Sequence, residues 1–97
     1  AAMIESPKYL FAHVRHPDDF RPEVTSIVLF GLASTEGQIF YLEIRYIDFE
    51  RNIIEGDHLM WSLEEAYEYA FIDYGIRELD WRPLSKVEIE KIESSIG

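Results

Sequence analysis

The chain contains no cysteine. This absence excludes disulfides, thiolate catalysis and zinc sites with cysteine ligands, and it suits a reducing compartment. Long apolar runs are also missing, because no segment approaches the roughly 18 to 20 residues that a membrane-spanning helix needs. The first residues lack the charged-then-apolar order of a signal peptide. We therefore expect a soluble, cytoplasmic protein that does not enter a membrane.

Positive charge is scarce. The 97 residues include 9 Lys and Arg against 19 Asp and Glu, which gives a formal net charge of −10. Such a charge repels phosphate backbones and anionic lipid surfaces, so we expect no direct binding to nucleic acid or membranes. The composition is nevertheless that of a folded protein, with 47% hydrophobic and 14% aromatic residues. The length predicts a single domain spanning residues 1–97.

Alternating apolar and polar residues predict three strands in the first half of the chain, over 8–16, 24–34 and 38–49. The second segment is apolar on both alternating faces, which places it in the centre of a sheet. The glycine-containing turn 34–37 predicts an antiparallel hairpin between the second and third strands. The third segment changes phase near 46–48, which predicts a bulge or a sharp bend there.

A capping box marks the start of one helix. Ser62 precedes Glu65 by three residues, so the serine hydroxyl can accept from the Glu65 amide while the glutamate reaches back. Gly75 stands where a left-handed C-terminal cap belongs. The apolar residues between them recur at helical spacing and define the expected buried side: Leu63, Ala66, Tyr67, Ala70, Phe71 and Tyr74.

A second capping box, Ser85 with Glu88, predicts a helix over 86–95. Leu84 and Ile89 can form a hydrophobic staple at its start.

The remaining segments are less regular. Residues 51–61 fit either a turn at 55–57 between two short strands or an irregular crossover, and 77–81 suggests a short edge strand that Pro83 ends. The sum is an α+β fold in the order β-β-β-α-(β)-α, with an antiparallel sheet of three or four strands and two helices.

One face of this sheet combines aromatic and charged residues. We expect the helix after Ser62 to cover Leu10, Ala12, Val14, Phe40, Leu42 and Ile44. The other face would then carry Tyr9, Phe11 and Tyr41 with His13, Arg15, Glu43 and Arg45, joined by Ile27 and Leu29. Such a face is too apolar to stand in water. Either the second helix or residues 51–61 cover it, with pairs such as Arg15 and Glu43 satisfying the charges, or it is a partner interface, for example in a homodimer.

Little in the sequence points to catalysis. The chain has no glycine-rich phosphate loop, nucleophile elbow or zinc-binding helix. A metal site would need the loop to bring together His16, Asp18 and Asp19, and His58 has no nucleophile beside it. We therefore expect neither an enzyme nor a bound metal or cofactor. A hydrolase or metal-dependent enzyme built around His13, His16 and His58 is the least favoured alternative.

Acidic residues concentrate between residues 55 and 80, where eight carboxylates accompany a single base, Arg77. This pattern attracts a basic protein and speeds its association. The predicted partner-binding residues on the helix are Glu64, Glu65, Glu68, Tyr69 and Asp73, with Tyr67 and Tyr74 as further aromatic anchors; on the sheet they are Tyr9, Phe11 and Tyr41. The favoured hypothesis is a small acidic, non-catalytic binding protein, such as an inhibitor or immunity protein for a cationic toxin nuclease. The alternative is a homodimeric structural or small-ligand-binding module that uses the aromatic sheet face.

Overall fold

The computed structural model describes residues 6–96 and has an antiparallel sheet of five strands in the order β4-β3-β2-β1-β5. The strands are β1 (Tyr9–His13), β2 (Ser26–Ala33), β3 (Ile39–Asp48), β4 (Ile53–Met60) and β5 (Arg82–Pro83). The α+β class, the central position of β2 and the β2–β3 hairpin are confirmed.

Residues 51–61 form neither a turn between two strands nor a crossover. Most of this segment is one strand, β4, which pairs with β3 and forms an outer edge of the sheet with Asp57 and His58 exposed. Gly56 lies opposite Arg45, and a Cβ at Gly56 would come within 2.6 Å of the Arg45 guanidinium. The glycine therefore makes room for a side chain in mid-strand rather than bending the chain. With β4 and β5 the order becomes β-β-β-β-α-β-α, so the predicted strand count is too low.

The predicted bulge is present. The register between β3 and β4 shifts between Arg45 and Tyr46 and again between Tyr46 and Asp48. The extra residues restore the alternation that the sequence breaks at this point.

Both predicted helices form, and their caps explain where they begin. In α1 (Leu63–Tyr74) the Ser62 Oγ accepts a hydrogen bond of 3.1 Å from the Glu65 amide, and Gly75 ends the helix with a φ of 68°. In α2 (Lys86–Ile96) the second capping box is reciprocal. The Ser85 amide donates to Glu88 over 2.8 Å, and the Glu88 amide donates to the Ser85 hydroxyl over 3.2 Å.

The edge strand predicted over 77–81 is wrong in position. Residues Glu78–Asp80 form a 3-10 turn, η1, because Asp80 accepts hydrogen bonds from both the amide and the guanidinium of Arg77. The strand follows as β5, which pairs with β1.

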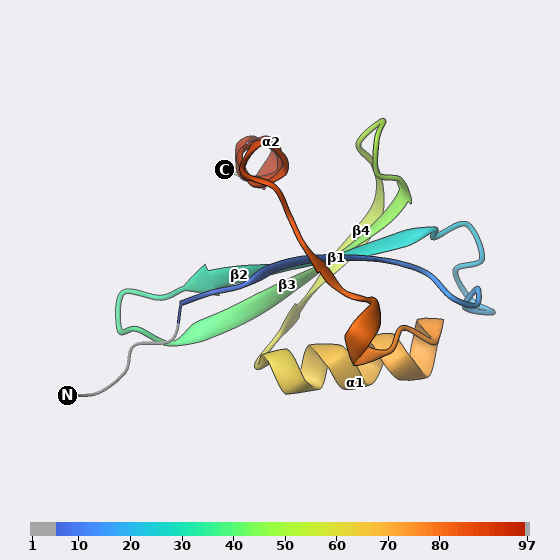
Figure 1. Ribbon diagram of the computed structural model, residues 1–97, viewed down its shortest axis with the longest axis horizontal. Coiled ribbons are helices and arrows are strands. Elements are labelled where there is room, and N and C mark those ends of the chain that lie inside the picture. The colour runs from blue at the N-terminus through green and yellow to red at the C-terminus, as the bar shows by residue number, and fades with distance from the viewer. Residues whose placement is uncertain (1–5, 97) are drawn as a thin grey trace.

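The two helices lie on opposite faces of the sheet (Figure 1). Under α1 the core contains Leu10, Ala12, Ile27, Leu29, Tyr41, Met60, Ala66, Ala70 and Tyr74. Under α2 it contains Phe11, Val28, Phe30, Ile44, Tyr46, Leu84 and Ile92, with Ile89 packed against it. Both faces of the central strand are thus buried, as its apolar sequence predicts.

The predicted division of the sheet faces is right for β1 and wrong for β2 and β3. Ile27 and Leu29 were expected on the face away from the first helix, but they lie under α1. Leu10 pairs with Leu29, which pairs in turn with Glu43, so the Tyr41 and Glu43 side of β3 faces α1. Phe11 lies under α2, on the opposite face from Tyr41, and both side chains are buried. The single face expected to carry both Phe11 and Tyr41 therefore does not exist, and of the alternatives for the Phe11 face the structure has the one in which the second helix covers it.

The first cap offers a direct test of the helix assignment. Substitution Ser62→Ala should lower the free energy of unfolding by about 1 kcal/mol, because the Glu65 amide loses its acceptor. Urea denaturation followed by circular dichroism measures this, with Thr35→Ala at the exposed β2–β3 turn as the control. An unchanged midpoint and slope would contradict the assignment.

Candidate functional site

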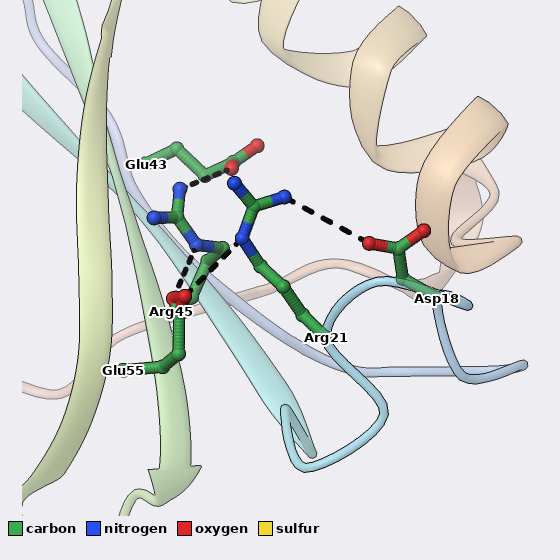
Figure 2. Close-up of polar contacts among 5 residues, drawn as sticks. All are labelled: Asp18, Arg21, Glu43, Arg45 and Glu55. Carbon is green, nitrogen blue, oxygen red and sulfur yellow. Dashed lines mark hydrogen bonds and ion pairs between the residues drawn. The ribbon is translucent and has the colours of Figure 1, made fainter.

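A chain of alternating charges lies between the sheet and the C-terminal part of α1 (Figure 2). Arg45 on β3 donates to Glu55 on β4 over 2.9 Å and lies 3.5 Å from Glu43. Arg21, from the connection between β1 and β2, donates to the same Glu55 over 3.2 Å and lies 3.8 Å from Asp18. Five residues from three segments are thus held in one ion-pair cluster. The pairing of Arg15 with Glu43 is wrong, because Arg15 contacts Asp80.

The innermost member is Glu43, which is 4% exposed. Burial raises the pKa of its carboxyl above the usual value, while the neighbouring Arg45 pulls the pKa down. One carboxylate oxygen, Oε2, has no hydrogen-bond partner among residues 6–96. By contrast, the hydrogen bond from Arg45 lowers the pKa of Glu55.

The charges of the same cluster act on Tyr74, at the end of α1. Burial, reinforced by the nearby Glu43 charge, raises the pKa of its phenol to about 12. The phenol therefore stays protonated at neutral pH.

The chemistry of this cluster is that of ion pairing. It contains carboxylates and guanidinium groups, and its two arginines each contact two carboxylates. The cluster ties β3, β4 and the β1–β2 connection together below α1. It also occupies two arginines, the nearly buried Arg45 and the exposed Arg21.

The other arginines are occupied as well. Each of the six arginines in the chain lies within 4 Å of a carboxylate, and the remaining pairs are Arg15–Asp80, Arg51–Asp48, Arg77–Asp80 and Arg82–Glu88. Exposed pairs of this kind add little stability. The pairs nevertheless fix where the arginine side chains lie on the protein, and α1 itself carries no basic residue.

Three exposed carboxylates of α1 have no such partners within residues 6–96. Glu64, Glu68 and Asp73 are exposed, and none of them takes part in an ion pair within residues 6–96. Phe71 and Ile72 lie on the same helix with 60% and 66% of their surface exposed. We call these five residues, together with the exposed Tyr69, the α1 surface.

The structure brings together only part of the predicted set. Tyr69 is exposed on α1, whereas Glu65 is half-buried. Tyr74 is buried and Tyr67 is half-buried, so neither is available as an aromatic anchor on the surface. Tyr9 is half-buried on the α2 side.

Phe71 and Ile72 are the surface residues that the sequence analysis missed. Helical spacing had assigned Phe71 to the buried side. The small residues Ala66 and Ala70 form the contact with the sheet instead. Adjacent residues project about 100° apart around a helix, so Phe71 and Ile72 cannot both point into the core. Two large apolar neighbours in the sequence of this helix were therefore a sign that at least one of them is exposed.

The three histidines have separate surroundings. His13 lies against Phe11 with 4.9 Å between ring centroids, His16 lies beside Gly75, and His58 is paired with Glu43 across the strands. Within residues 6–96, no three histidine, aspartate or glutamate side chains are grouped so that they could hold a metal ion.

Neither a family model, a curated protein nor a solved structure matches this chain. None of the helices between residues 6 and 96 is long and apolar enough to cross a membrane.

Proposed function

We propose that this protein is a small, non-catalytic binding protein that engages a basic protein through the α1 surface. The observation that carries the proposal is the distribution of charge. The fold pairs all six arginines elsewhere, and within residues 6–96 the carboxylates of α1 have no ion-pair partner.

The unpaired carboxylates carry a cost within the helix itself. Glu64 and Glu68 are four residues apart on one face, and like charges at this spacing destabilise a helix by about 0.2 to 0.5 kcal/mol. A cationic partner would relieve this repulsion. Unpaired surface charge of one sign also steers an oppositely charged protein during encounter.

Phe71 and Ile72 supply apolar contact area next to the charge. Interfaces combine an apolar centre, in which aromatic residues are enriched, with a polar rim. On α1 the exposed Phe71 and Ile72 lie within one turn of Glu68 and Asp73, so the surface offers both parts. An inhibitor or immunity-type protein for a cationic toxin, such as a nuclease, fits this chemistry.

The proposal can be tested with a triple variant, E64Q/E68Q/D73N. A basic partner captured from the native host should associate with this variant about tenfold more slowly than with the wild type at 0.05 M salt, because steering is lost. Stopped flow measures the rate. The variant should be as stable as the wild type or slightly more stable, because intrahelical repulsion is relieved.

The matched control, E36Q/E90Q/E93Q, removes three exposed carboxylates from the β2–β3 turn and α2. Its association rate should stay closer to that of the wild type. Raising the salt to about 0.5 M shortens the Debye length from roughly 14 Å to about 4 Å, so the wild-type rate should approach that of the α1 variant. Equal rates for the two triple variants would show that α1 is a solvated face with no role in binding.

A further inference from the structure

A cavity of about 450 Å³ lies on the other side of the sheet, where β1, the β3 bulge and the start of α2 meet. Its lining includes Phe11, His13, Ser26, Phe49, Glu50 and Arg82. The volume is in the range of sites for small molecules. The cavity is distinct from the α1 surface, because α1 and α2 lie on opposite faces (Figure 1).

The first indication of a ligand is the hydroxyl of Ser26. Ser26 is 2% exposed and pairs with His13 on one side and Tyr46 on the other. Its Oγ has no hydrogen-bond partner among residues 6–96. A buried hydroxyl without a partner is costly, so such a group beside a cavity points to a polar atom that enters it.

The second indication is the aromatic wall. Phe11 and Phe49 pack with 4.6 Å between ring centroids, and Tyr46 packs against Phe49 at 5.0 Å. The Arg82 guanidinium already stands 4.5 Å from the centre of the Phe11 ring. This wall therefore attracts positive charge through the faces of its rings.

The third indication is the charge of the lining. It includes the carboxylates Asp48, Glu50 and Glu88 against the single guanidinium of Arg82. Glu88 holds Arg82 through two hydrogen bonds of 3.0 Å, and Asp48 pairs with Arg51. Glu50 has no ion-pair partner within the described part of the chain.

From these three features we propose that the cavity binds a small organic cation, an ammonium group on an aromatic or aliphatic body. The Ser26 hydroxyl accepts a hydrogen bond from the ammonium group, Glu50 supplies the opposite charge, and the Phe11 and Phe49 rings contact the apolar body. An anionic ligand would meet three carboxylates and a guanidinium that is already paired, which disfavours it.

Three probes that share the phenethyl body and differ in charge isolate the effect of charge: phenethylammonium, neutral phenethyl alcohol and anionic 3-phenylpropionate. Titration of the ¹⁵N-labelled protein should give amide shifts at residues 11–13, 25–26 and 48–50. We expect phenethylammonium to bind at least about tenfold more tightly than either of the other two probes. Equal affinities for the cation and the alcohol would overturn the proposal.

The site is tested separately by Glu50→Gln, which should weaken phenethylammonium binding about fivefold. The matched control is Glu36→Gln, which removes one exposed carboxylate from the β2–β3 turn and should leave the affinity unchanged. If the two substitutions weaken binding equally, the cation is attracted only by the net charge of the protein. Amide shifts on α1 in place of the cavity residues would likewise refute the cavity as its site.

Discussion

Replacement of Arg45 by methionine should lower the free energy of unfolding by about 3 to 5 kcal/mol. Arg45 is nearly buried, with 11% of its side chain exposed, and contacts both Glu43 and Glu55. Methionine fills much of the same volume but leaves the buried Glu43 without a counter-charge. The loss comes from this uncompensated carboxylate rather than from the intrinsic strength of the ion pair.

Urea denaturation of three further variants identifies the cause. Arg51→Met breaks an exposed pair with Asp48 and should change stability by less than about 1 kcal/mol. The double variant Glu43→Gln/Arg45→Met should recover part of the loss, because the buried charge is gone, while Glu43→Gln alone should have a small effect. If Arg45→Met behaves like Arg51→Met, Glu43 does not depend on Arg45 in the folded protein.

The second large effect is expected at alkaline pH. The pKa of Tyr74 is about 12 in the folded protein, whereas an unfolded tyrosine ionises near pH 10. Below pH 10 the phenol keeps its proton in both states, so its contribution to stability is fully present. Between pH 10 and 12 only the unfolded state releases the proton, so the free energy of unfolding falls as pH rises, by roughly 2 to 3 kcal/mol in total.

Substitution Tyr74→Phe should remove this part of the alkaline loss. The midpoint of urea denaturation, measured from pH 8 to pH 12, should fall less with rising pH for Tyr74→Phe than for the wild type. Tyr69→Phe removes a hydroxyl from the exposed side of the same helix and serves as the matched control. An alkaline slope in Tyr74→Phe as steep as in Tyr69→Phe would contradict the assignment.

The parts of the fold that the sequence predicts correctly depend on neighbours along the chain. Ser62 and Glu65, or Ser85 and Glu88, are three residues apart, and their capping bonds need nothing from the rest of the protein. The β2–β3 hairpin likewise follows from a short turn. Local chemistry of this kind is visible in a single sequence.

The errors in the sheet involve contacts between distant residues, whereas the turn at Glu78–Asp80 is held by local Arg77–Asp80 bonds that the sequence analysis did not identify. Which side of β3 faces α1 depends on its register with β2, and a one-residue shift exchanges the faces. β4 was missed because Gly56 resembles a turn residue, whereas its role is to accept the Arg45 side chain eleven positions away. The excess of acidic over basic residues can be counted in the sequence. Which carboxylate each arginine pairs with is known only from the folded structure.

The open edge of the sheet bears on how the protein avoids aggregation. β4 presents eight residues of backbone at this edge, and unpaired N–H and C=O groups there are a template for strands of other chains. Asp57 is exposed near the middle of the strand. An antiparallel pair of two copies centred on Asp57 would place both carboxylates opposite each other, about 5 Å apart between Cα atoms. Asp57, which belongs to neither of the proposed binding sites, thus makes this edge a poor template for pairing with a second copy of the chain.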